Sequence, residues 1–136
     1  MKKVLLTIIF LSASYAIYAQ NVTAELKAYL RQNGWNVATE QYACLSEGEF
    51  ASYSKTFYAG TEYTIIAYSE ESGVMDIDVF LYDEDGSLLE EDSDNADVAT
   101  VGYAPYVSRE MSVVFMNYDS VNSIKEYNCK LMIAYK

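Results

Sequence analysis

The strongest constraint on the fold is a change in hydrophobic periodicity at Gly48. After this glycine, apolar and polar side chains alternate in short runs, which is the pattern of half-buried β-strands. In the clearest run, Tyr127, Cys129, Leu131, Ile133 and Tyr135 share one face, while Asn128, Lys130 and Lys136 share the other. Strands are predicted at residues 49–57, 62–69, 76–82, 87–90, 98–103, 111–117 and 127–135. Short strands separated by turn residues predict an antiparallel β-sandwich, an all-β fold.

One helix is predicted before the strands, at about residues 21–33. Val22, Leu26 and Leu30 recur at helical spacing, Asn21 or Thr23 can cap the start, and Asn33-Gly34 can end it. A second short helix at residues 38–45 is the interpretation given to the mixed segment that follows. Between two of the strands, Asp83-Glu84-Asp85-Gly86 predicts a hairpin turn closed by the glycine.

The first 19 residues have the layout of a secretory signal peptide. Lys2 and Lys3 precede an apolar run over residues 4–11, and small residues lead to Ala19. Cleavage after Ala19 leaves residues 20–136 as a single domain that is secreted or periplasmic. The apolar run is shorter than the ~20 residues of a spanning helix, so no integral membrane segment is expected after cleavage.

Both cysteines lie in the exported part of the chain. Because exported proteins meet an oxidising compartment, a disulfide between Cys44 and Cys129 is predicted. The alternative is a pair of separate buried thiols.

The chain is strongly acidic and contains no histidine. It has 20 acidic and 9 basic side chains, a formal charge of −11. The signal peptide contains two of those basic residues and no acidic one, so the mature charge is −13. Nucleic acid is therefore not expected as a partner, because phosphate binding needs clustered Lys and Arg. The lack of histidine excludes Ser-His-Asp and Cys-His catalysis and imidazole zinc sites.

Twelve carboxylates fall between residues 70 and 97, and no basic residue lies between Lys55 and Arg109. The default interpretation is a solvated edge that keeps a secreted protein soluble. The alternative is a calcium site, since clustered oxygens are what this cation binds, although the spacing does not match an EF-hand. The candidate calcium ligands are Asp76, Asp78, Asp83, Asp85, Asp92 and Asp94. No other cofactor is predicted.

Four segments between residues 58 and 118 occur in a recognisable order: AGTEYTIIAYSE, GVMDIDVFLYDEDGSLLEED, ATVGYAP and MSVVFMNY. This order resembles the bacterial pre-peptidase C-terminal domain. The matching positions are Gly60, Tyr63, Ile65, Asp76, Asp78, Leu81, Tyr82, Asp83 and Gly86. The resemblance implies a jelly-roll-like sandwich of about seven to eight strands that assists export, surface attachment or substrate binding beside secreted enzymes.

The function predicted from these features is a non-catalytic, exported binding or accessory module that contacts a protein or polysaccharide surface. Two alternatives remain. One is a small carboxylate-dependent hydrolase of the glycosidase kind, which needs paired carboxylates in a cleft. The other is a secreted structural or inhibitory protein. A short chain of small strands leaves little depth for a substrate cleft, so the enzyme is the less favoured prediction.

Overall fold

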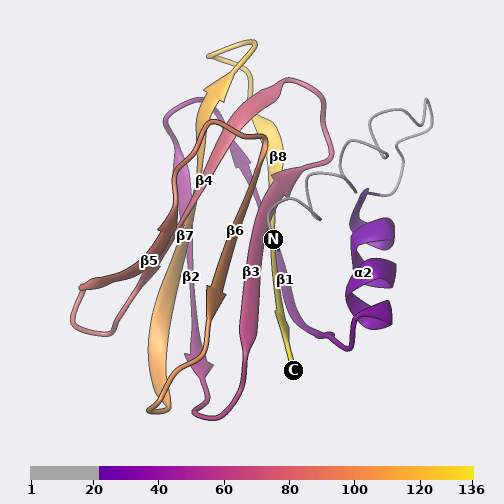
Figure 1. The fold of residues 1–136 in the computed structure, drawn as a ribbon. Helices are drawn as coiled ribbons and strands as arrows, with labels where there is room; N and C mark the ends of the chain where they lie inside the picture. Colours follow the sequence, from indigo (N-terminus) through magenta and orange to yellow (C-terminus); the bar gives the residue numbers. More distant parts are fainter. Residues whose placement is uncertain (1–21) are drawn as a thin grey trace.

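A computed structural model describes residues 22–136, in which one helix is followed by eight strands (Figure 1). The helix α2 spans Val22–Gln32, which confirms the predicted helix. The strands are β1 (Asn36–Leu45), β2 (Phe50–Phe57), β3 (Tyr63–Ser69), β4 (Val74–Tyr82), β5 (Leu88–Asp92), β6 (Val98–Tyr103), β7 (Arg109–Ser120) and β8 (Tyr127–Tyr135). The predicted signal peptide lies outside the described residues. Within residues 22–136, no helix has the length and apolar character needed to cross a membrane.

The strands form two four-stranded antiparallel sheets. Sheet A has the order β1-β8-β3-β6 and sheet B the order β2-β7-β4-β5. The first strand pairs with the last, the second with the seventh, the third with the sixth and the fourth with the fifth. This is the pairing of a long antiparallel ribbon rolled into a two-sheet jelly roll. The predicted all-β, jelly-roll-like sandwich with one N-terminal helix is confirmed.

The inner faces of both sheets meet in the main core. Ile77, Val79 and Leu81 of β4 are fully buried there, as the alternation in this strand predicts. From sheet A, Leu131 and Ile133 of β8 pack into the same cluster. The two-residue period of these strands therefore separates core side chains from outer ones.

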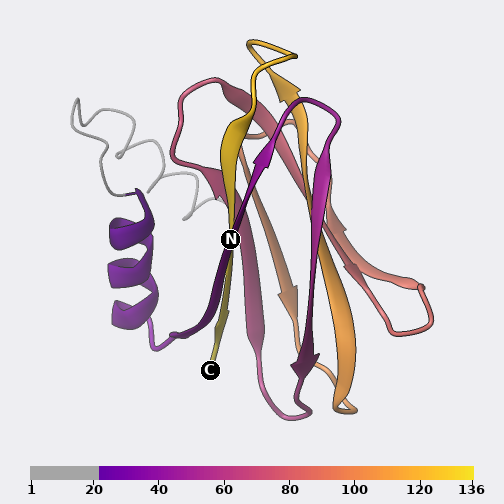
Figure 2. The same cartoon turned by 180° about the vertical axis from the view of Figure 1, so that it is seen from behind.

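The helix forms a third layer against the outer face of sheet A (Figure 2). Leu26 is fully buried and Leu30 is 2% exposed, and both pack with Met132 of β8. The helix ends in a Schellman motif, because Trp35 N–H donates to the Leu30 carbonyl and Gly34, at φ 82°, donates to the Arg31 carbonyl. Sheet A is thus covered on both sides.

The predicted second helix is wrong, because residues 38–45 belong to strand β1. This strand pairs with β8 along its whole length, from Asn36 opposite Tyr135 to Leu45 opposite Tyr127. A register shift between Val37 and Thr39 interrupts the ladder. As an edge strand with exposed outer side chains, β1 carries too weak an alternation to identify it from its own residues.

The hairpin turn between β4 and β5 is confirmed. Gly86 N–H donates to the Asp83 carbonyl at 3.0 Å, and Asp83 N–H donates to the Ser87 carbonyl at 2.8 Å. Gly86 has a φ of 84°, in the left-handed region that glycine adopts without strain.

The layer between α2 and sheet A generates a stability prediction. Leu26→Ala should lower the free energy of unfolding by about 2–5 kcal/mol, because it removes a fully buried side chain and leaves a cavity. Urea denaturation of the variant and the wild type measures this difference. The matched control is Gln32→Ala at the exposed end of the same helix, which should change the free energy by no more than about 0.5 kcal/mol. Equal losses in the two variants would contradict the packing role of the helix.

Candidate functional site

Three of the predicted calcium ligands are buried beside β4. Asp76 and Asp78 are 5% and 4% exposed, and Asp92 is 3% exposed. The chain after β5 runs back along β4, where Ile77 N–H donates to the Ala96 carbonyl at 2.8 Å. The backbone N–H of Ala96 also donates to the Asp76 carboxylate. A solvated edge is therefore the wrong description of these three side chains.

Asp76, Asp78, Asp92 and Asp94 form a carboxylate cluster, and burial changes the proton affinity of two of its members, Asp76 and Asp78. The pKa of Asp78 is raised to about 6. Loss of solvation is the largest cause, and the negative charges of the other three members add to the rise. Burial also raises the pKa of Asp76, while the hydrogen bond from Ala96 opposes the rise. Asp76 Oδ1 and Asp78 Oδ1 are buried and have no hydrogen-bond partner among the described residues. Two interacting carboxyl groups of this kind titrate as a pair.

The other two predicted ligands lie elsewhere. Asp83 and Asp85 are in the hairpin turn, at the opposite end of β4 from Asp76. Asp83 Oδ2 pairs with Arg109 Nη1 at 2.5 Å, and Asp85 Oδ1 accepts the Ser87 N–H at 2.9 Å. The hydrogen bonds from Ser87 lower the pKa of Asp85. The six predicted ligands thus form two separate groups. Among the described residues, no set of three or more such side chains has metal-binding geometry, and calcium stays a prediction.

The predicted Cys44–Cys129 disulfide is not formed, and both cysteines are free thiols. Cys129 lies opposite Ala43, and Cys44 lies opposite Asn128. Since side chains alternate along a strand, this register places Cys44 on the outer face of sheet A and Cys129 in the core. Burial raises the pKa of Cys129 to about 12, which keeps it a thiol.

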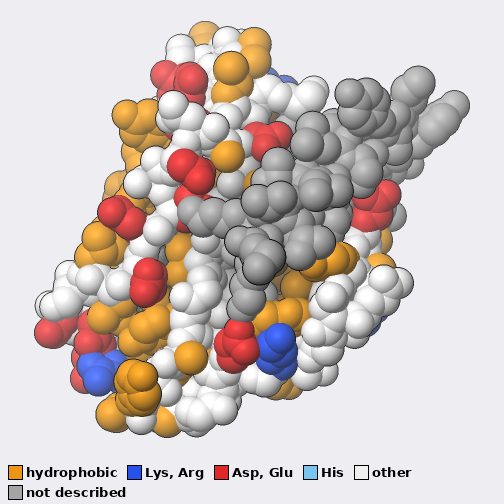
Figure 3. Space-filling view, viewed as in Figure 1, with side chains coloured by type: hydrophobic (Ala, Val, Ile, Leu, Met, Phe, Trp, Pro, Cys, Tyr) orange, Lys and Arg blue, Asp and Glu red, His pale blue; other side chains and the backbone are white. Residues whose placement is uncertain are grey.

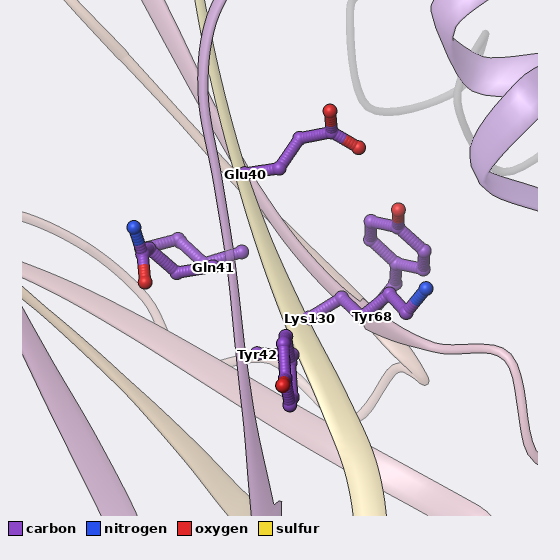
Figure 4. A pocket seen from close by; sticks show the side chains of 6 residues that line it. Glu40, Gln41, Tyr42, Tyr68 and Lys130 are labelled. Atoms are coloured by element: carbon purple, nitrogen blue, oxygen red, sulfur yellow. The ribbon is translucent and has the colours of Figure 1, made fainter.

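A small hollow opens on the outer face of sheet A (Figure 4). Its lining residues are Glu40, Gln41, Tyr42, Tyr68, Lys130 and Leu131. Several of its polar groups already have partners: Lys130 Nζ lies 2.9 Å from Glu70, and Glu40 lies 2.6 Å from Lys27 of the helix. Its volume of about 100 Å³ is well below the 300–1,000 Å³ of ligand pockets. We interpret these ion pairs as polar contacts at the edge of the interface between α2 and sheet A, and not as a ligand site.

The end of the sandwich formed by residues 58–60, 83–87 and 104–108 presents aromatic side chains to solvent. We call it the turn surface. Tyr106 is 99% exposed, Tyr58 is 59% exposed and Val107 is 57% exposed. The turns 58–60 and 104–108 lie side by side in both ribbon views (Figures 1 and 2), joined by a 2.8 Å hydrogen bond from Ala59 N–H to Ser108 Oγ.

The turn surface is anchored to the core beneath it. Tyr58 N–H donates to the Tyr63 hydroxyl at 2.8 Å, and the Tyr63 ring is 2% exposed. That ring meets Phe57 edge to face, with 4.7 Å between the centroids. Because these partners are buried, the turn at residues 58–60 has a defined position.

Negative charge borders the turn surface. The Arg109–Asp83 ion pair ties the hairpin turn to the start of β7. Glu84, Asp85 and Glu110 are exposed and take part in no ion pair within the described residues. In the space-filling view, acidic and basic side chains adjoin hydrophobic ones at the lower left (Figure 3).

The turn surface was not predicted from the sequence. Tyr58 and Tyr106 lie in turns, outside the alternating segments that predict strands. The available indications were the neighbouring turn residues, Gly60 and Pro105. What the sequence did not indicate is that the two turns meet.

The raised pKa of Asp78 predicts a pH-dependent stability. At pH values below its ordinary pKa of 3.8, Asp78 is protonated in both the folded and unfolded states. As the pH rises through about 6, the folded state must ionise a buried carboxyl, so stability is lost. Asp78→Asn should therefore be more stable than the wild type at pH 7, by about 1–2 kcal/mol after allowance for screening. It should also lose less stability between pH 4 and pH 7 (roughly the interval between the two pKa values).

Denaturant unfolding at several pH values measures this effect. Asp97→Asn is the matched control, because Asp97 is exposed on the same segment. A wild-type stability that rises from pH 4 to pH 7, with no difference between the two variants, would contradict the burial of the Asp78 charge.

The calcium prediction can be tested on the same cluster. A ligand at a hundred times its dissociation constant that binds only the folded state adds about 2.7 kcal/mol. Calcium should then raise the melting temperature by several degrees, at roughly 3–6 °C per kcal/mol, above the shift in sodium chloride of equal ionic strength. Asp94→Asn should remove the difference, and Asp83→Asn should retain it. Equal shifts in the two salts would leave the acidic segment without a calcium site.

Comparisons with known proteins identify a similar fold and no family. No protein-family model matches the chain, and no curated protein matches it. Among solved structures, it is similar to PliG from Aeromonas hydrophila, a periplasmic lysozyme inhibitor of g-type lysozyme. The two share 11% sequence identity with a TM-score of 0.50, over 76% of this chain and 90% of that chain. The resemblance to the pre-peptidase C-terminal domain has no counterpart in these matches and stays a prediction. At this identity, the likeness shows that the two chains have a common fold.

Proposed function

We propose that this chain is an exported, non-catalytic inhibitor that binds another protein. The observation that carries the proposal is the turn surface, where Tyr58, Tyr106 and Val107 protrude from the end of a sandwich. Tyrosine is enriched at protein interfaces, because it combines apolar area with a polar tip. A protruding, aromatic surface is suited to contact a protein.

The buried carboxylates argue against the hydrolase alternative. A glycosidase places its two carboxyl groups on either side of a bound sugar, about 5–10 Å apart. Asp76 and Asp78 instead lie two residues apart on strand β4 and are 5% and 4% exposed. Neither carboxyl can reach both a substrate and its partner across a cleft.

The signal-peptide layout and the fold similarity together favour an exported inhibitor over an accessory module. The signal-peptide layout predicts that the chain leaves the cytoplasm. The fold is similar to that of PliG, which inhibits g-type lysozyme in the periplasm. A partner of the same class, a glycan-cleaving enzyme that reaches the cell envelope, is the most specific version of this proposal.

The test is inhibition of a g-type lysozyme by the mature protein, residues 20–136. We expect the rate of peptidoglycan hydrolysis to fall to a plateau at stoichiometric inhibitor, and a complex to form in titration calorimetry. An unrelated protein of similar size and negative charge is the control for non-specific attraction. Absence of both binding and inhibition, or hydrolysis of the glycan by the protein itself, would contradict the proposal.

A further inference from the structure

We infer that a divalent cation, calcium rather than magnesium, binds where the start of β4, the end of β7 and the segment between β5 and β6 meet. The ligands are Asp76 and Asp78 of β4, Asp119 of β7 and Asp94 of the connecting segment. This site differs from the one expected from the acidic run, because it leaves out the hairpin turn and includes Asp119, which lies outside that run. The inference goes beyond the proposed function and does not depend on it.

Two buried oxygen atoms in this region lack the partners that buried polar atoms normally have. Asp76 and Asp78 are 5% and 4% exposed, and Oδ1 of each has no hydrogen-bond partner among the described residues. Neither side chain forms an ion pair within that part of the chain. A buried carboxylate without a partner is costly, and a bound ion or water commonly accounts for such atoms. The two side chains therefore form the base of a site that requires positive charge.

Strand β7 brings a third carboxylate to the buried pair. Asp119 lies directly opposite Asp76, between two shifts in the register of β4 and β7. Like charges in opposite positions destabilise a sheet, and a cation between them removes the repulsion. The negative charges of Asp119 and Asp94 also raise the pKa of Asp76, so all three carboxylates lie within electrostatic range of one another.

The segment between β5 and β6 supplies the fourth carboxylate, Asp94. This segment is held on β4 by the hydrogen bond from Ile77 N–H to the Ala96 carbonyl, at 2.8 Å, and Asp92 Oδ2 accepts the Thr100 N–H at 2.8 Å. Figure 1 shows the segment, the start of β4 and the end of β7 together at the upper end of the sandwich. Because the segment leads from sheet B to sheet A, a cation at this place would fasten the connection between the two sheets.

The irregular backbone around these carboxylates suits calcium better than magnesium. Calcium accepts about six to eight oxygens in flexible arrangements, whereas magnesium demands a nearly ideal octahedron and keeps several waters. In the described residues, no three of the carboxylates surround a common point, but Asp94 and Asp119 are exposed and can rotate toward the buried pair. Since the site must rearrange, we expect a dissociation constant of roughly 10⁻⁴–10⁻³ M, as in extracellular calcium modules.

The experiment titrates calcium chloride into the mature protein, residues 20–136, at constant ionic strength in a calorimeter. Asp78→Asn and Asp119→Asn should each raise the dissociation constant about tenfold or more, because even the residues behind metal ligands contribute roughly 10–100-fold. Asp97→Asn is the matched control, since this exposed carboxylate lies on the same segment, and it should bind calcium like the wild type. Melting curves in the presence of a chelator establish that each variant is folded.

Amide hydrogen exchange locates the ion independently of affinity. Calcium should slow exchange several-fold at residues 94–97, relative to the protein in chelator, because it stabilises the segment against local opening. Exchange in the hairpin turn at residues 83–86 should stay the same.

Four results would overturn the inference. Absence of binding at millimolar calcium would leave a shared proton as what the buried pair holds. Equal affinity of the wild type and Asp119→Asn, or slowed exchange confined to the hairpin turn, would place the ion elsewhere. Magnesium binding as tight as calcium binding would overturn the choice of ion. Lysozyme takes part in none of these measurements, so their failure is separate from failure of the proposed function.

Discussion

The burial of strand β8 on both of its faces is the constraint on which the other layers depend. Its inward side chains, among them Leu131, fill the core between the sheets, and its outward Met132 packs against the helix. The same strand pairs with both β1 and β3. Sheet A and the helix layer can form only when the last segment of the chain is in place. Such long-range pairing is characteristic of folds that form slowly, because distant segments must meet before they gain contacts.

Strong alternation explains why most of the fold could be predicted from the sequence. Strands β4 and β8 are covered by other elements, so a wrong residue type on their inner faces would be costly, and the two-residue period is clear. Strand β1 is different, since Glu40, Gln41 and Tyr42 are all exposed at the edge. Its position is determined by the hydrogen-bond ladder with β8, which the local sequence does not encode.

The candidate sites were harder to predict, because residues that are close in the sequence can lie far apart along a hairpin, while residues distant in the sequence can pair across it. Residues equally distant from the turn become neighbours, so Asp78 approaches Asp92, while Asp83 and Asp85 remain at the tip. This grouping follows from the predicted turn. The burial of Asp76 does not, since it requires the segment through Ala96 to run back along β4. The turn surface depends on two turns almost 50 residues apart meeting through Ala59 and Ser108, which only the three-dimensional structure shows.

The rolled topology gives the turns at residues 58–60 and 104–108 a property that a hairpin turn lacks. Each of them leaves one sheet and enters the other: β2 in sheet B leads to β3 in sheet A, and β6 in sheet A leads to β7 in sheet B. Together they form a seam that closes one end of the sandwich. A force that separates the two sheets at this end must therefore act through these two short turns and the hydrogen bond between them.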